Sequence, residues 1–221
     1  MTLNQILPEP LPANPLSIAA DWMAEAHRRR DQPNSNAMVL ATCNQDGQPS
    51  ARVVLCKGIE PEPGRVLFVS NYESRKGAEL AANPRAALVF HWDHSHRQVR
   101  MEGVVVRATN ADSDLYFAQR PRASQLGAHA SLQSRPIASR SQLVEQLEAV
   151  TERYGVAPPP EGKPIPRPAH WGGYVFWVSA VELWMEGAAR VHDRARWTRP
   201  LDVSGGNPVP GACWDATRLQ P

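Results

Sequence analysis

Cationic side chains in this sequence gather at spacings that could bind phosphate. Arg52 and Lys57 lie in the apolar stretch SARVVLCK (50–57), five positions apart, which places them on opposite faces of an ideal strand. They would therefore serve two ligands, or two ends of one ligand, unless a bulge intervenes. Arg75 and Lys76 begin an expected helix, whose free N–H groups and positive dipole end favour a phosphate. Ordinary surface salt bridging is the alternative for that pair.

A further group combines a phenol, a guanidinium and a hydroxyl. Tyr116 and Arg120 are four positions apart and would share a helix face, and Ser124 follows closely. These three side chains form a compact set of phosphate donors. The group therefore predicts a site for an organic phosphate.

The histidines suggest two different roles. Arg190, His192 and Arg194 alternate along an expected strand and would share one of its faces. Such a face could bind a ligand, although a polar outer strand without a ligand is an equally good interpretation.

The run His91–His96 has spacings that a metal could accept. However, it falls where two strands should be joined, and histidines in such loops are commonly solvated. We therefore expect no metal site.

Composition narrows the class of protein. The chain has 221 residues, a formal net charge of +2 and three cysteines, which form no C-x-x-C pair. So small a charge argues against a general nucleic-acid binder, and unpaired cysteines indicate a reducing compartment. Because there is no signal-peptide pattern and no long apolar run, we expect a cytoplasmic protein without a membrane segment. No dinucleotide fingerprint, P-loop or nucleophile elbow is present.

Apolar periodicity predicts a mainly β protein. Strand patterns cover 37–43, 50–57, 65–70, 85–92 and 97–109, and β-rich segments follow at 172–185, 188–199 and 213–219. Helical patterns begin at Ser17 and recur near 74–82, 111–119 and 140–154. Residues 1–16 are proline-rich and predict a flexible arm, and 157–168 predict a connector. Since regular βαβ alternation is missing, we expect an antiparallel barrel with peripheral helices.

Several motifs together resemble the pyridoxine/pyridoxamine 5′-phosphate oxidase family. In order they are NAMVLAT, ARVVLCK, SRKGAEL, NPRAAL, RQVRMEG, YFAQRPRASQLGA, LQSRPI, HWGGY, VELWMEGAARVHDR and RLQP, spanning about residues 36–221. The most specific are R-P-x-x-S-Q-x-G and R-x-H-D-R. The resemblance implies an FMN-binding split β-barrel oxidase domain over 17–221, which includes a C-terminal dimerisation region. It also implies a homodimer with FMN at the subunit interface.

The resemblance further implies which residues would contact the ligands. FMN would contact Arg52, Val53, Val54, Leu55, Cys56, Lys57, Val69, Ser70, Arg75, Lys76, Gln98, Gln133, Ser134, Trp184 and Arg194. The partner subunit would supply the last four of these. The substrate phosphate would contact Lys57, Tyr116, Arg120 and Ser124, while the catalytic pair Arg190 and His192 would lie over the pyridine ring.

The implied reaction oxidises pyridoxamine or pyridoxine 5′-phosphate to pyridoxal 5′-phosphate. A hydride would pass from C4′ of the substrate to the flavin, and O2 would then be reduced to H2O2. Three departures keep an oxidase of phenazine biosynthesis as an alternative. An Arg-x-x-Tyr pair is missing from the arm, Val69 replaces a common aromatic residue, and Ala188-Ala189 precede Arg190 where larger polar residues are frequent. The phosphate donors favour the vitamin B6 substrate. A non-catalytic flavin- or haem-binding barrel is a further alternative, and a nucleic-acid-binding barrel a distant one.

Overall fold

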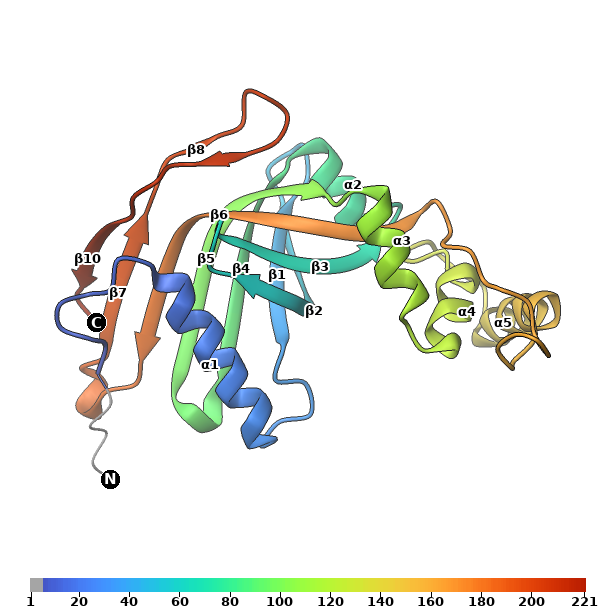
Figure 1. Ribbon diagram of the computed structural model, residues 1–221, viewed down its shortest axis with the longest axis horizontal. Coiled ribbons are helices and arrows are strands. Elements are labelled where there is room, and N and C mark those ends of the chain that lie inside the picture. Colours follow the sequence, from blue (N-terminus) through green and yellow to red (C-terminus); the bar gives the residue numbers. More distant parts are fainter. Residues whose placement is uncertain (1–5) are drawn as a thin grey trace. The chain divides into compact units, whose positions relative to one another are not determined.

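The computed structural model describes residues 6–221, which divide into two compact units (Figure 1). The barrel unit comprises the chain up to Phe68, Ala82–Val106 and Val175–Pro221, and the helical unit comprises Val69–Ala81 and Arg107–Tyr174. Strands β3 and β6 contribute residues to both units.

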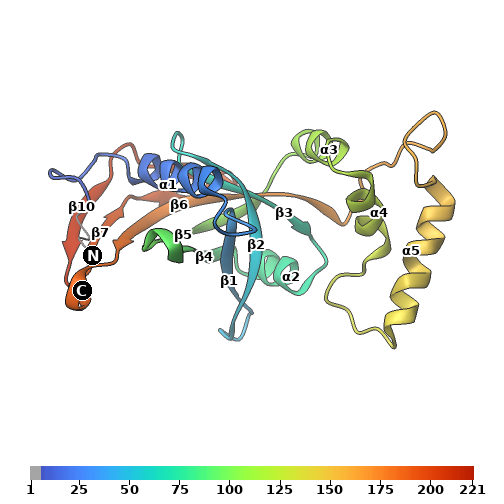
Figure 2. The ribbon, with the colours of Figure 1, turned by 90° about the horizontal axis from the view of Figure 1, so that it is seen from below.

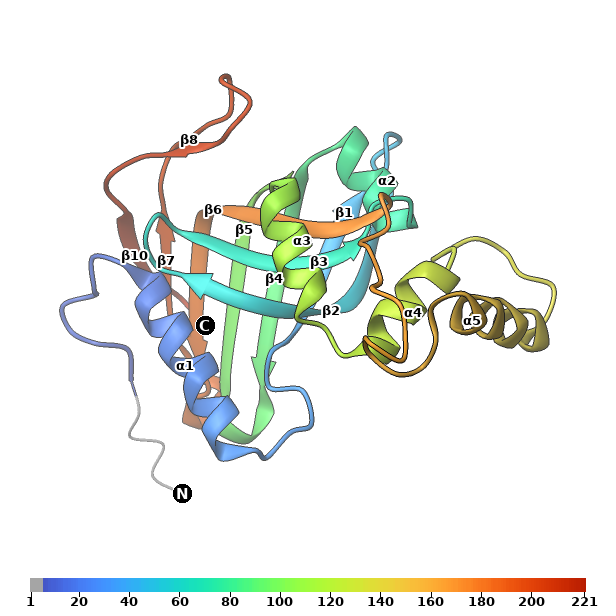
Figure 3. The same ribbon diagram turned by 45° about the vertical axis from the view of Figure 1, so that its right-hand side comes forward.

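Six strands form the core of the barrel unit. They are β1 (Ala37–Cys43), β2 (Pro49–Glu60), β3 (Arg65–Asn71), β4 (Arg85–Trp92), β5 (Arg97–Arg107) and β6 (Trp171–Met185). The sheet order is β10-β7-β6-β3-β2-β1-β4-β5, and an additional β5–β6 pairing closes these six strands into an antiparallel barrel (Figure 3). The predicted fold class, mainly β with peripheral helices, is confirmed.

The remaining strands extend the sheet beyond β6. β7 (Asp193–Thr198) pairs with β6, and β10 (Asp215–Leu219) pairs with β7. The short hairpin of β8 (Leu201–Asp202) and β9 (Val209–Pro210) lies between them in sequence and was not predicted. β7 begins only at Asp193, because a short 3-10 turn (Ala188–Arg190) precedes it. The prediction that Arg190, His192 and Arg194 alternate on one strand is therefore wrong.

Side-chain alternation explains the barrel core. In β1, Met38, Leu40 and Thr42 are buried, whereas Val39 between them is 38% exposed.

The turn from β1 to β2 contains the Asp-Gly pair that predicted a hairpin. Asn44 Oδ1 accepts hydrogen bonds from the backbone N–H groups of residues 46 and 48, and Gly47 has φ 83°. Local chemistry thus determines this hairpin.

Helix α1 (Pro15–Arg29) begins two residues before the predicted start. Asn14 caps it by accepting the Leu16 N–H, and the left-handed Arg30 ends it. The buried face contains Leu16, Ala19, Trp22 and Ala26, at helical spacing. Pro15 and Leu16, the last residues of the predicted arm, therefore belong to the helix.

The described part of the predicted arm contacts the sheet extension. The Leu7 N–H donates to Asp193, and Trp197 Nε1 donates to the Pro12 carbonyl. Leu7 is 1% exposed. Residues 1–5 of the predicted arm lie outside the described residues.

The helical unit contains α3 (Asn110–Ala118), α4 (Arg122–Ala130) and α5 (Arg140–Tyr154), together with all but the last residue of α2 (Arg75–Ala82). α4 and α5 lie side by side (Figure 2). α5 matches its predicted range, and Ser139 caps it by accepting the Gln142 N–H. α4 was missed, because its residues were interpreted only as phosphate donors.

The described chain has no disulfide, membrane-spanning helix or metal cluster. Cys43, Cys56 and Cys213 are all free thiols, and burial raises the pKa of Cys56 to about 11. Within residues 6–221, none of the helices combines the length and apolar character that crossing a membrane requires. In the same range, histidine, cysteine and acidic side chains form no group of three or more suited to a metal ion.

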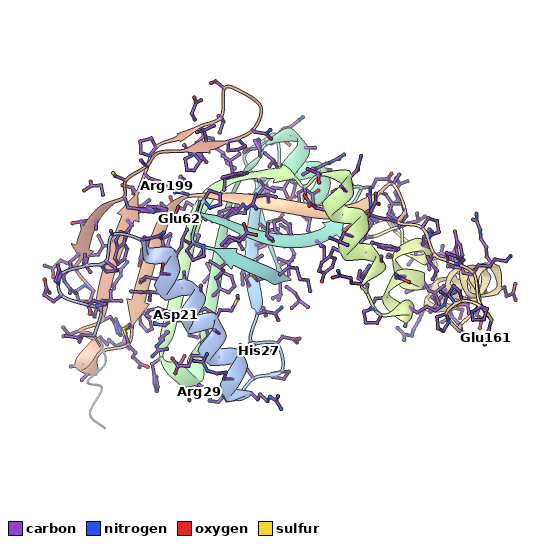
Figure 4. The ribbon with its side chains drawn as sticks, viewed as in Figure 1. Asp21, His27, Arg29, Glu62, Glu161 and Arg199 are labelled. Carbon is purple, nitrogen blue, oxygen red and sulfur yellow. The ribbon has the colours of Figure 1, made fainter. Side chains whose placement is uncertain are left out.

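Arg199 ties the β2–β3 turn to β6. Its guanidinium donates to the carbonyls of Pro63, Gly64 and Val178 and stacks at 4.3 Å on the Trp214 ring. Burial lowers the pKa of Arg199, and Glu62 opposes that shift; both residues are labelled in Figure 4. This buried guanidinium is therefore held chiefly by backbone carbonyls.

Replacing Gly64 by alanine is expected to destabilise the protein by about 3 kcal/mol. Gly64 has φ +95°, and a Cβ there would lie 2.0 Å from Arg199 Nη2, so the guanidinium would have to leave its carbonyls. Gly47→Ala is the matched control, since Gly47 has φ +83° and no atom within 4 Å of its Cβ position. The control should lose about 1 kcal/mol, the cost of the backbone conformation alone. Urea unfolding measures both, and equal losses would contradict the role of Arg199.

Candidate functional site

The candidate site residues fall into three groups, each lying within one unit. The first group surrounds Lys76 in the helical unit. Lys76 is 8% exposed, and its Nζ donates to Ser70 Oγ (3.1 Å), Ser74 Oγ (3.1 Å) and Gln133 Oε1 (2.8 Å). Ser74 Oγ also accepts the Gly77 N–H at the start of α2. An ammonium, two hydroxyls and a helix N-terminus are therefore collected at one place.

This group unites residues that are far apart in sequence. Ser70 is the penultimate residue of β3, Lys76 lies in the first turn of α2, and Gln133 lies in the loop after α4. We expected Gln133 to come from the partner subunit, yet here it contacts Lys76 of its own chain. The neighbouring Ser134 has φ 74°, a conformation that non-glycine residues adopt rarely and that often marks functional loops.

Arg75, by contrast, points outward. Its side chain is 63% exposed and pairs with Glu79 at 2.9 Å, as the salt-bridge alternative predicted. The chemistry of the Lys76 group still suits a phosphate, because cationic and hydroxyl donors beside a helix N-terminus stabilise a dianion.

The second group is built on the ring of Trp171. The Arg120 guanidinium lies 4.4 Å from the ring centroid of Trp171, and the Tyr116 ring stacks on the same indole at 6.3 Å. Arg120 lies just beyond the end of α3, so the shared indole, more than a shared helix face, brings the two side chains together. Ser124 is half-buried in the first turn of α4.

Arg120 has an unusual environment. Its Nη1 is buried and has no hydrogen-bond partner within residues 6–221. Burial lowers the pKa of Arg120, and Tyr116 acts in the opposite direction. Buried donors are normally paired, and an orphan usually has a partner that binds later or a functional reason. A bound anion would satisfy it.

The neighbouring cation Arg122 has a structural role instead. It donates to the carbonyls of Tyr154, Gly155 and Lys163, and so holds the segment after α5. Gln125 donates to the Phe117 carbonyl. Of the cluster Arg120–Gln125, these two side chains therefore maintain the fold.

The third group lies in the barrel unit around the β6–β7 connection. The rings of Trp184 and His192 lie 4.7 Å apart. Arg194 pairs with Trp184 across the two strands and donates to Glu182 at 2.8 and 3.1 Å. Arg190 is exposed, with φ 64°. These residues thus gather at one turn, although not on one strand.

The remaining predicted contacts lie on β2, β3 and β5. Along β2, burial alternates from Pro49 to Lys57, so that Arg52 is half-buried and Lys57 exposed. Arg52 and Lys57 therefore lie on opposite faces of β2, as predicted. The register of the β2–β3 pairing shifts only between Cys56 and Gly58. Arg52 donates to Leu40 O, Thr42 Oγ1 and Ser50 Oγ. Three further predicted FMN contacts on these strands, Val54, Val69 and Gln98, are also half-buried.

Sequence reasoning missed Trp171, Ser74 and Glu182 as site residues. Trp171 stands in the HWGGY motif and Glu182 in VELW, so both were within recognised motifs but had been given no role. Ser74 was predicted as the first residue of the helix 74–82, whereas it directly precedes α2, a position at which serine commonly caps a helix.

Comparison with known proteins agrees with this architecture. The chain aligns with PhzG from Burkholderia lata 383, solved with tetrahydrophenazine-1-carboxylic acid, at a TM-score of 0.84 and 26% identity over 100% of both chains. A pyridoxamine 5′-phosphate oxidase-related, FMN-binding protein from Nostoc punctiforme gives a TM-score of 0.65 at 16% identity, covering 90% of this chain and 95% of that one. The fold is therefore that of the FMN-binding split barrels.

Sequence comparison is more specific. Residues 23–154 match the family model for pyridoxamine 5′-phosphate oxidase, and 171–221 match that for the pyridoxine 5′-phosphate oxidase C-terminal dimerisation region. A pyridoxine/pyridoxamine 5′-phosphate oxidase of Gluconobacter oxydans is 47% identical over 212 residues, 96% of each chain. One from Burkholderia lata is 46% identical over 200 residues, 90% of this chain and 86% of the relative. The chain belongs to the pyridoxine/pyridoxamine 5′-phosphate oxidase family.

Proposed function

We propose that this protein oxidises pyridoxamine 5′-phosphate and pyridoxine 5′-phosphate to pyridoxal 5′-phosphate, with FMN as cofactor and O2 as acceptor, giving H2O2. The observation that carries the proposal is the orphaned Nη1 of Arg120 on the Trp171 ring. A substrate phosphate would give that donor its partner, with Tyr116 and Ser124 of the same unit as further donors.

The chain's own residues would bind and orient the reactants. Lys76, with Ser70, Ser74 and Gln133, suits the phosphate of FMN, and Ser134 would contribute from the same loop as Gln133. FMN, when bound, supplies the hydride acceptor that no side chain provides. Arg190 and His192 would cover the pyridine ring and hold C4′ in position, so that orientation accounts for much of the rate.

An anaerobic experiment tests the proposal. Pyridoxamine 5′-phosphate is mixed with the purified, FMN-loaded protein without oxygen, and flavin absorbance is followed. We expect rapid bleaching, recovery of colour in air, and formation of the aldehyde and peroxide. Pyridoxamine without its phosphate is the matched control and should bleach far more slowly. A protein that binds FMN but does not bleach with either phosphorylated substrate would contradict the proposal.

Oxidation of a reduced phenazine carboxylate is the second candidate, because the PhzG structure shares the fold over its whole length. Such a substrate has a carboxylate and no phosphate. Bleaching by the phenazine and not by the phosphorylated substrates would favour it. A protein that binds flavin or haem without oxidising any of these compounds would instead be a binding protein.

The proposed homodimer has a candidate face on the outside of the barrel. Val39, Val53 and Leu55 are 38%, 65% and 38% exposed, and Val39 pairs directly with Val53 and with Val89. Alanines 41, 51 and 87 continue this row on β1, β2 and β4. An apolar surface spread over three neighbouring strands is typical of a protein interface.

Val53→Asp is therefore expected to convert the dimer into a monomer. A carboxylate buried in an apolar contact would cost several kcal/mol, enough to raise the dimer Kd at least about 100-fold. Val156→Asp is the control, since Val156 is 75% exposed in the connector after α5. Analytical ultracentrifugation measures both variants. An unchanged dimer for Val53→Asp would place the interface elsewhere.

A further inference from the structure

The turn between β6 and β7 holds the imidazole of His192 through a hydrogen bond from its backbone. The backbone N–H of Gly187 donates to Nδ1 of His192 at 3.2 Å, and the Trp184 ring lies against the imidazole. A backbone N–H can only donate, so Nδ1 must offer its lone pair. The single proton of the neutral ring is therefore on Nε2.

Functional histidines are often oriented by a carboxylate or a backbone carbonyl that accepts the proton of one ring nitrogen and so makes the other nitrogen a proton acceptor. Here the nearby carboxylates have other partners: Asp193 accepts from the Leu7 N–H and Arg218, and Glu182 accepts from Arg194 and Arg100. The polarity at His192 is thus the reverse of that in a carboxylate–histidine pair.

Position 187 requires the absence of a side chain. A Cβ there would lie 1.7 Å from the Val191 carbonyl oxygen and 3.2 Å from the His192 Cα. The backbone of Gly187 itself is extended, with φ −114°, so the requirement is one of space. Ala189 and Arg190, at φ 53° and 64°, fold the turn back so closely that the Val191 N–H reaches the Ala188 carbonyl at 3.0 Å.

The residue before Gly187 is anchored independently. The Glu186 N–H donates to the His96 carbonyl at 3.0 Å, and its carboxylate contacts His96 Nδ1. The peptide that carries the Gly187 N–H is therefore held on both sides, by the β4–β5 connection and by the folded turn.

We propose that Gly187 is a positioning residue that keeps His192 in the Nε2–H tautomer. His192 then serves the substrate as a hydrogen-bond donor and does not act as a general base. The identity of the acceptor rests on the proposed function: the oxygen on the pyridine ring of a vitamin B6 phosphate is an acceptor of the required kind. The tautomer itself depends only on the turn.

The tautomer can be measured directly by ¹⁵N NMR of the FMN-loaded protein with ring-labelled histidine. The chain has seven histidines, and His192→Gln identifies the resonance of interest. We expect a protonated Nε2 and an unprotonated Nδ1 for His192 in the wild type, and a mixture in Gly187→Ala. Gly205→Ala is the matched control, because a Cβ there has no atom within 4 Å. A proton on Nδ1 in the wild type overturns the proposal.

Kinetics give a second readout. Gly187→Ala should lower kcat/KM about 10-fold or more, the usual effect of losing a group that orients a functional histidine, whereas Gly205→Ala should not. Should Gly187→Ala fail to fold, two variants of His192 replace it. Glutamine can place an N–H near the Nε2 position, whereas the shorter asparagine reaches only to the Nδ1 position, where its carbonyl can accept from Gly187, so His192→Gln should retain more activity. Equal or reversed activities overturn the donor role.

The outcomes also separate this proposal from the proposed function. An Nε2–H tautomer in a protein that oxidises no vitamin B6 phosphate would support the positioning role and contradict the substrate. Oxidation of a vitamin B6 phosphate by a protein whose His192 carries its proton on Nδ1 would support the proposed function and contradict the positioning role of Gly187.

Discussion

Lys76→Met is expected to give a protein that purifies without flavin and has less than about 1% of the wild-type activity. A charge-assisted contact with phosphate contributes on the order of 3 kcal/mol, so the Kd for FMN should rise about 100-fold or more. The substitution also removes the donor shared by Ser70, Ser74 and Gln133, which further disturbs the group. Fluorescence titration of the stripped protein with FMN measures the Kd.

Lys163→Met is the matched control. The chain has only three lysines, and Lys163 is exposed in the connector after α5. Its substitution should leave flavin content and affinity unchanged. Circular dichroism of the stripped Lys76 variant checks that the fold persists. A folded Lys76→Met protein that retains wild-type affinity for FMN would show that the Lys76 group does not hold the cofactor.

Arg120→Met is expected to raise KM for pyridoxamine 5′-phosphate about 100-fold, with kcat changed only a few-fold. The reason is that the guanidinium would bind the phosphate, which is remote from the reacting C4′ and is bound alike before and during the reaction. The slow oxidation of unphosphorylated pyridoxamine should stay unchanged. Arg120→Lys should recover only part of the loss, because an ammonium lacks the planar fork. Steady-state kinetics on both substrates tests this.

Stability separates a binding role for Arg120 from a structural one. A buried donor without a partner destabilises the free protein, so Arg120→Met without substrate should unfold at the same temperature as the wild type or higher. Arg153→Met is the control for activity, since Arg153 stacks on Tyr154 at 5.2 Å in the last turn of α5 but belongs to none of the three groups. An unchanged KM for Arg120→Met together with a large loss of stability would make Arg120 a structural residue.

Local sequence patterns were sufficient to predict most of the strands and three of the helices in the helical unit. β1, β4 and α5 have the predicted ranges, and the Asp-Gly turn joins β1 to β2 as expected. These elements could be predicted because side-chain alternation and helix capping depend only on residues a few positions apart. α4 was missed because its residues were interpreted only as phosphate donors, and because polar residues and a glycine interrupt its apolar pattern. Contacts such as that of Gln125 with Phe117 hold it in place.

Some of the candidate site residues could be predicted from the sequence. The candidate phosphate donors Tyr116, Arg120 and Lys76 were selected by residue type and spacing, and the family followed from several motifs in order. The error at Arg190 had a local cause: an alternating pattern of charged residues is shared by a strand and by a tight turn that leads into one. Only the left-handed backbone of Ala189 and Arg190 distinguishes the two.

The strand-rich class, the family and the residue types that could bind two phosphates could thus all be inferred from the sequence. The packing of Trp171 against Arg120, the contact of Gln133 with Lys76 within one chain, and the hydrogen bond from Gly187 to His192 became visible only in the folded protein. These contacts depend on which surfaces are buried together and on how each turn closes. Such distances between remote residues leave no periodic pattern in the sequence.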